Sequence, residues 1–235
     1  AREGRGNPAR DTKCWIARDW NCQTRLIARS GRGVSMAAAP IIRVDVNEYE
    51  DQLAAKVERV KTQFRDFYSG ELDVRRSKKS HYRMRAEFRV WHDYDKGDMY
   101  YIMFKGTGNS AERVRVDDFN VGSELMNELL QKVISHVRKI EVLNKKLFQI
   151  NYHTSLSGQA MVALLYHKKL DAAWEEEARK LRELLADCEG VEKDYVPALI
   201  GRSRKQKVVL GDDFVIEKMV VSGKELRYKQ MEGAF

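Results

Sequence analysis

The chain has 235 residues, which allows one large domain or two small ones, and 43% of them are hydrophobic, enough for a core. No apolar run approaches the length of a membrane helix, and three cysteines without a CxxC pair predict no disulfide framework. Residues 1–36 hold eight basic and three acidic side chains and carry most of the +8 formal charge, so the remainder could bind nucleic acid only through a local basic face.

Residues 1–40 are predicted to be a disordered basic leader or tail, because no helical or strand period persists there. An organellar transit peptide and untranslated sequence read through in error are equal alternatives. Since no Met precedes Met36, either the true start is missing or Met36 is the start. We expect a cytoplasmic protein, or a plastid or mitochondrial one if residues 1–36 are a transit peptide. Residues 41–235 are expected to form one folded domain.

The first predicted element is a helix that begins with Asn47 as its N-cap and ends near Gly70. Its apolar residues recur at helical spacing. They are Tyr49, Leu53, Val57, Val60 and Phe64. Residues 71–80 follow as a basic loop.

Residues 80–93 read as a strand with two different faces, because apolar and charged side chains alternate with a period of two. One face holds Tyr82, Met84, Ala86, Phe88 and Val90. The other holds Arg83, Arg85, Glu87, Arg89 and Trp91. Periodicity alone favours a solvated face in which Glu87 pairs with its neighbours. The alternative is a face that binds phosphates and bases.

The remaining pattern mixes hairpins with flanking helices, without strict βαβ alternation. Strands are predicted at Met99 to Lys105, Glu112 to Asp117, Leu147 to Thr154, Gln159 to His167, Ala198 to Arg202, Lys207 to Leu210 and Leu226 to Gln230. Helices are predicted after Ser123, around Trp174 to Leu185, and as a short segment from Asp212 or Asp213 to Met219. The fold class is therefore α+β, with a largely antiparallel sheet.

The titratable residues offer no catalytic or metal centre. The five histidines show no metal-ligand spacing, so no metal site is predicted. Cys188 near the end of a predicted helix is expected to be a packing residue and not a nucleophile.

Five ordered blocks of sequence are more specific than any single motif. They are SHYRMRAEFRVWHD (80–93), KLFQINY (146–152), LLYHKKLD (164–171), LIGR (199–202), and SGKE with YKQ (222–225 and 228–230). With these blocks the chain resembles, from about Asn47 to Phe235, the N-terminal half of the TrmA family of tRNA (uracil-5-)-methyltransferases.

The resemblance implies a chain that stops before its catalytic half. The family carries a nucleophilic cysteine, a general base and the S-adenosyl-L-methionine site in a C-terminal Rossmann-like domain, and it methylates C5 of the T-loop uridine, m5U54. This sequence ends at Phe235, the aromatic of the family's uracil-pocket element. We therefore expect the full-length enzyme to use S-adenosyl-L-methionine, and this chain to bind no cofactor and to be inactive alone.

The predicted contacts with the tRNA T-arm come from two sources. The resemblance implies that Phe148 stacks on tRNA bases and that Arg89 and His167 touch the T-arm, although Phe148 shares its predicted face with Ile150 and Tyr152 and reads as core on pattern alone. From the pattern we add Arg83, Arg85, Lys168 and Arg202. Arg202 lies in a predicted basic turn, and the default interpretation of such a turn is a solvated surface.

Three hypotheses remain open. The leading one is the tRNA-recognition portion of a tRNA (uracil-5-)-methyltransferase, expected to be a monomer that contacts neither membrane nor metal. The second is a stand-alone, non-enzymatic RNA-binding module. The third is a protein-interaction domain whose basic loops bind acidic partners.

Overall fold

The computed structural model describes residues 43–105 and 111–233, which fall within one compact unit. Its helices are η1, a 3-10 turn (Val46–Glu48), α1 (Tyr49–Phe64), α2 (Glu124–Val137), α3 (Glu141–Asn144) and α4 (Ala172–Ala186). Its strands are β1 (Arg85–Asp93), β2 (Asp98–Lys105), β3 (Glu112–Val116), β4 (Leu147–Thr154), β5 (Ala160–Tyr166), β6 (Ala198–Ser203), β7 (Gln206–Leu210), β8 (Phe214–Val221) and β9 (Lys224–Met231). The predicted tail, residues 1–40, lies outside the described residues.

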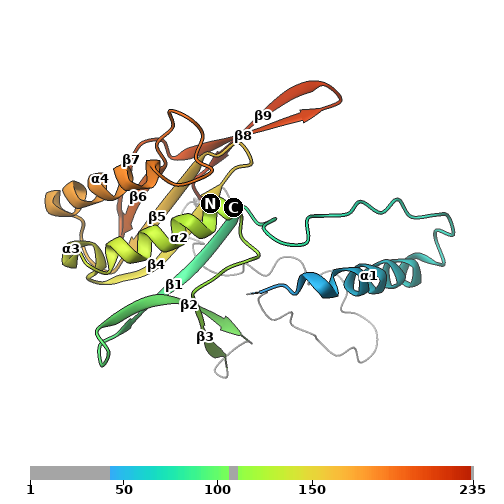
Figure 1. Ribbon diagram of the computed structural model, residues 1–235, viewed down its shortest axis with the longest axis horizontal. Helices are drawn as coiled ribbons and strands as arrows, with labels where there is room; N and C mark the ends of the chain where they lie inside the picture. The colour runs from blue at the N-terminus through green and yellow to red at the C-terminus, as the bar shows by residue number, and fades with distance from the viewer. Residues whose placement is uncertain (1–42, 106–110, 234–235) are drawn as a thin grey trace, which may run out of the picture. The chain divides into compact units, whose positions relative to one another are not determined.

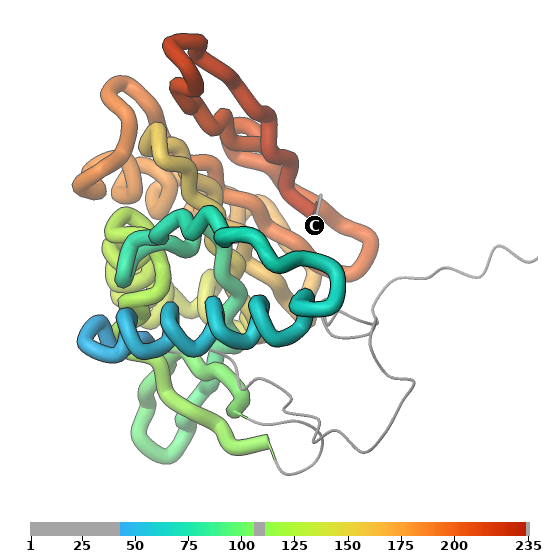
Figure 2. The backbone as a smooth tube through the Cα atoms, turned by 90° about the vertical axis from the view of Figure 1, so that its right-hand side faces the viewer, coloured from blue at the N-terminus to red at the C-terminus, as the bar shows by residue number. Residues whose placement is uncertain are grey.

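Seven strands form one sheet in the order β3-β2-β1-β4-β5-β6-β7 (Figure 1). Every neighbouring pair is antiparallel except β5 and β6, which α4 connects as a crossover. β8 and β9 pair only with each other and project beyond the large sheet (Figures 1 and 2). The predicted α+β class with a largely antiparallel sheet is confirmed.

The core lies between one face of this sheet and the helices α2, α3 and α4 (Figure 1). In β1 the side chains of Ala86, Phe88 and Val90 are buried there, whereas Glu87 and Arg89 are exposed on the opposite face. The predicted alternation of β1 is confirmed, although the strand begins at Arg85. We call the face of the sheet that carries Arg89 the outer face.

α2 begins where the sequence predicts. The Ser123 hydroxyl accepts a hydrogen bond from the Met126 N–H, which satisfies one of the unpaired donors of the first turn. The predicted apolar stripe is buried throughout, and it consists of Met126, Leu129, Leu130, Val133, Ile134 and Val137. α2 is thus a core helix, as predicted.

A glycine of β6 lets α4 pack closely on the sheet. A Cβ on Gly201 would stand 2.3 Å from the indole of Trp174, a fully buried residue of α4. The block around Gly201 therefore contributes to packing at this position, because a larger side chain would displace the helix.

The prediction for the first helix is wrong in its cap and its end. The side chain that caps is Asp45, which accepts from the N–H of Asn47 inside η1, and α1 ends at Phe64. No residue of α1 is buried, so its apolar stripe packs against little of the described chain. Instead Glu50 of α1 pairs with Arg76 at 2.7 Å.

The predicted short helix from Asp212 or Asp213 to Met219 is also wrong, because that segment belongs to strand β8. Half of the residues of β8 are β-branched, which favours a strand, and they are Val215, Ile216, Val220 and Val221. A two-residue turn, in which Ser222 and Gly223 have φ of 50° and 76°, then returns the chain as β9. Two positive φ values are typical of the tight hairpin turn that suits the strand twist.

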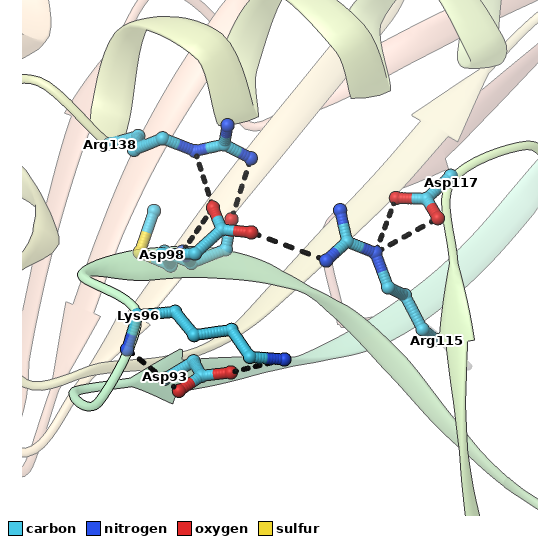
Figure 3. A network of polar contacts seen from close by, with 7 residues as sticks. Asp93, Lys96, Asp98, Arg115, Asp117 and Arg138 are labelled. Carbon is cyan, nitrogen blue, oxygen red and sulfur yellow. Dashed lines mark hydrogen bonds and ion pairs between the residues drawn. The ribbon is translucent and has the colours of Figure 1, made fainter.

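Asp98 connects three elements at one end of the sheet (Figure 3). Its carboxylate accepts from the N–H of Met99 at 2.8 Å and pairs with Arg115 of β3 at 3.2 Å and Arg138 after α2 at 3.4 Å. The Met99 bond and then the two guanidinium groups hold the pKa of Asp98 below its ordinary value. The network therefore connects β2 to β3 and to the end of α2.

Candidate nucleic-acid interface

A β-bulge in β4 decides where Phe148 points. Leu147 pairs with Tyr166 and Gln149 with Leu165, so Phe148 is an extra residue in the strand. Leu147 and Ile150 both remain buried in the core, while Phe148 and Gln149 both turn outward. The prediction that Phe148 shares a face with Ile150 and Tyr152 is therefore wrong, and its ring is only half-buried.

Phe148 forms a layered cluster on the outer face with a histidine and an arginine. The His167 ring stacks on Phe148 with centroids 4.0 Å apart and planes 11° apart. The guanidinium carbon of Arg89 lies 5.5 Å from the Phe148 centroid, within the range of a cation–π contact. Three residues from β1, β4 and the end of β5 thus form one surface, which we call the Phe148 cluster.

Backbone contacts hold His167 in this stack. Its N–H donates to the carbonyl of Lys146 at 2.9 Å, which extends the β4–β5 pairing by one residue. Lys146 itself has a φ of 58°, a left-handed conformation at the entrance to the bulged strand. His167 is exposed, so the outer surface of the stack is open to a ligand.

Two other predicted residues lie apart from this cluster. Arg83 precedes β1, where its backbone bonds with Val121 and Ser123, and its side chain is exposed. Arg85 is half-buried and pairs with Glu87 at 3.3 Å. These contacts of Arg83 and Arg85 are with residues outside the Phe148 cluster.

The last two predicted contacts are engaged within the protein. Lys168 is half-buried, and its ammonium donates to the carbonyl of Val142 at 2.5 Å. Burial is the main cause that lowers the pKa of Lys168. Arg202 pairs with Glu232 at 2.8 Å. Phe235, the predicted uracil-pocket residue, lies outside the described residues.

Cys188 is the one cysteine among the described residues. Cys188 is buried in the core, and burial raises the pKa of its thiol to about 11, so the predicted packing role is confirmed. Within residues 43–105 and 111–233, no group of three or more His, Cys, Asp or Glu side chains could hold a metal ion. In the same ranges, no helix is long and apolar enough to cross a membrane.

Fold and cluster together define an α+β domain with an exposed aromatic and cationic sheet face. The family model of the tRNA (uracil-5-)-methyltransferases matches residues 48–235. A tRNA/tmRNA (uracil-C(5))-methyltransferase of Idiomarina loihiensis is 46% identical over 193 residues, which are 82% of this chain and 50% of the relative. One of Escherichia coli O157:H7 is 47% identical over 80% of this chain and 49% of the relative.

The chain belongs to the tRNA (uracil-5-)-methyltransferase family. It spans about half the length of the curated relatives it matches. The same fold occurs in the Pyrococcus abyssi tRNA (uracil-54, C5)-methyltransferase, which was solved with S-adenosyl-L-homocysteine. That match has a TM-score of 0.51 and 14% identity, and it covers 80% of this chain and 43% of the other.

Proposed function

We propose that this chain is the tRNA-recognition portion of an S-adenosyl-L-methionine-dependent methyltransferase that forms 5-methyluridine in the T-loop, m5U54. The Phe148 cluster binds the T-arm, with Phe148 and His167 as the stacking surface and Arg89 as a phosphate contact. The family membership of residues 48–235 supports the reaction class. The observation that carries the binding role is the exposed Phe148–His167 stack with Arg89 beside it.

The physics of loop recognition supports this role. Proteins hold unpaired bases by stacking them on aromatic side chains and by placing cations near the backbone. A ring pair on the outer face offers such a platform without any cost to the core. The arginine alongside forms no ion pair with the described residues, so its charge is uncompensated.

The crossover from β5 to α4 lacks the glycine-rich turn that is typical of a nucleotide-binding βαβ unit. In a βαβ unit a nucleoside-containing cofactor usually binds beside a glycine-rich turn between the first strand and the helix. Here the segment between β5 and α4 is residues 167–171, which contains no glycine. Its last residue, Asp171, caps α4 by accepting from the N–H of Trp174, so this carboxylate is already used in the helix cap. We therefore place the methyl donor outside the described residues.

Substitution of Phe148 tests the proposal. Phe148→Ala is expected to weaken binding of an unmodified T-arm hairpin RNA by about 1–3 kcal/mol, because one stacking platform is lost. The melting temperature should change little, since the ring lies outside the core. A binding titration paired with a thermal melt measures both.

Two phenylalanines supply matched controls. Phe67→Ala removes an 87% exposed ring after α1 and should leave affinity unchanged. Phe88→Ala removes a core ring and should cost about 3–5 kcal/mol of folding stability. If Phe148→Ala behaves like Phe88→Ala, with a large drop in melting temperature and unchanged affinity, the stacking role is wrong.

A stand-alone RNA-binding module is the second candidate. The buried thiol of Cys188, with its raised pKa, agrees with both candidates, because each expects no cysteine nucleophile among the described residues. Both candidates share the Phe148 cluster, and methyl transfer by a longer form of the chain distinguishes them.

A further inference from the structure

The outer face continues past the Phe148 cluster onto β1, β2 and β3. Trp91 follows Arg89 by two residues in β1 and so points to the same face, where its side chain is 37% exposed. The guanidinium carbon of Arg113 in β3 lies 4.0 Å from the centre of the Trp91 ring. Phe104, opposite Arg113 in the register, is 44% exposed. A second aromatic and cationic group thus adjoins the first.

The charge of Arg113 has no acidic partner in the part of the chain that the structure describes. It forms no ion pair with any residue of the described ranges, and its side chain is exposed. Arg115, two residues further along the same face, also lies over an aromatic ring, Tyr100, at 4.3 Å. Unlike Arg113, it is paired with Asp98 and Asp117 (Figure 3). An arginine therefore lies over an aromatic ring at two places on this face. The charge of Arg115 is neutralised by two carboxylates, whereas Arg113 forms no ion pair with the described residues.

We propose that Arg113, held against Trp91, is a second RNA contact that binds a backbone phosphate of the same T-arm. An arginine stacked on an indole keeps its planar donors directed outward while losing little side-chain freedom on binding. Arg113 is the contact residue, and Trp91 is a positioning residue. This inference rests on the proposed function, and it extends the binding surface from β4 and β5 to the edge strand β3.

The register of β1, β2 and β3 supports a single RNA-binding surface that runs across the three strands. Arg89 is opposite Ile102 in β2, and Ile102 is opposite Arg115 in β3, so Arg113 lies on the same face two residues further along β3. Neighbouring strands are about 5 Å apart, so β1 and β3 are separated by about 10 Å. The long side chains of two arginines can reach phosphates of one RNA strand across such a distance.

The salt dependence of RNA binding tests the proposal with the whole chain and an unmodified T-arm hairpin. Arg113→Gln should weaken binding several-fold and reduce the slope of log K against log salt by about 0.7–0.9, because one phosphate contact is removed. Arg115→Gln makes the same change of charge on the same strand and should leave the slope unaltered. Residues 1–40 are present in every variant, so their background is constant.

Substitution of Trp91 tests its positioning role separately from the phosphate contact. Trp91→Leu should lower affinity while leaving the salt slope nearly intact, since the arginine remains but is no longer positioned. Trp91→Phe should restore much of the affinity, because a flat ring is again present. Thermal melts confirm that each variant is folded.

The outcomes separate the two proposals. If Phe148→Ala weakens binding but Arg113→Gln changes neither affinity nor slope, the second contact is wrong and the proposed function stands. If Arg113→Gln and Arg115→Gln reduce the slope equally, the effect is one of net charge and the contact is again wrong. If neither Phe148→Ala nor Arg113→Gln affects binding, the proposed function itself fails.

Discussion

Two tyrosine hydroxyl groups meet inside the core, 2.5 Å apart, where β2 and β4 face α2. Tyr101 donates its proton to the carbonyl of Leu130 at 3.0 Å, so Tyr152 must be the donor within the pair. Burial raises the pKa of both phenols, which therefore stay neutral. The two residues consequently have unequal roles in one small network.

That inequality predicts different costs for the two phenylalanine variants. Tyr152→Phe removes one donor and leaves the Tyr101–Leu130 bond, so we expect a loss of about 0.5–1.5 kcal/mol. Tyr101→Phe removes both bonds and strands the Tyr152 hydroxyl without a partner, and we expect about 1–3 kcal/mol. Urea denaturation measures both; a larger loss for Tyr152→Phe would reverse the assignment of the protons.

At the scale of elements, the network around Asp98 holds β2, β3 and the end of α2 together. Asp98→Asn keeps an acceptor for the Met99 N–H but loses the attraction to both arginines, so we expect a loss of about 0.5–1 kcal/mol at neutral pH. For a domain of this size that is a drop of about 1–4 °C in melting temperature. The nearby Asp93→Asn should have almost no effect, because its partner Lys96 is 80% exposed.

The Asp98 prediction includes a dependence on pH. Folding lowers the pKa of Asp98 below its ordinary value of 3.8, so its contribution is present above that value and is lost as the pH falls through the folded pKa. Wild type and Asp98→Asn should therefore converge in acid. A stability difference that persists in strong acid would contradict the ion-pair account.

Sequence patterns predict an element correctly when its apolar residues recur with the same period as its buried positions. The alternation in β1 and the stripe of α2 lead directly to the core face, since the apolar positions of each pattern include its buried residues. Patterns fail where the conformation of a segment depends on its pairing with another strand. β8 is a strand that pairs with β9, and Phe148 faces outward because β4 has a bulge where it pairs with β5. The Phe148 cluster was predicted from resemblance, whereas Arg113 was not predicted at all.

At the scale of the whole molecule, we expect the chain to bind T-arm RNA without methylating it. The cysteine of the described residues is buried, and its pKa of about 11 keeps it protonated. With labelled S-adenosyl-L-methionine and unmodified tRNA, label in uridine should stay at background. The full-length Escherichia coli relative is the positive control for the assay. Label transferred by this chain alone would show that it contains a catalytic centre.

The bulge in β4 also determines how the strand tolerates a change in length. Elsewhere in a strand, losing one residue inverts every side chain beyond the gap. Across the bulge, Phe148 and Gln149 both face outward between Leu147 and Ile150, so deletion of Gln149 would leave Leu147 and Ile150 facing the core. At this position the strand can be shortened by one residue without altering its buried side, and the outward surface can vary independently of the core.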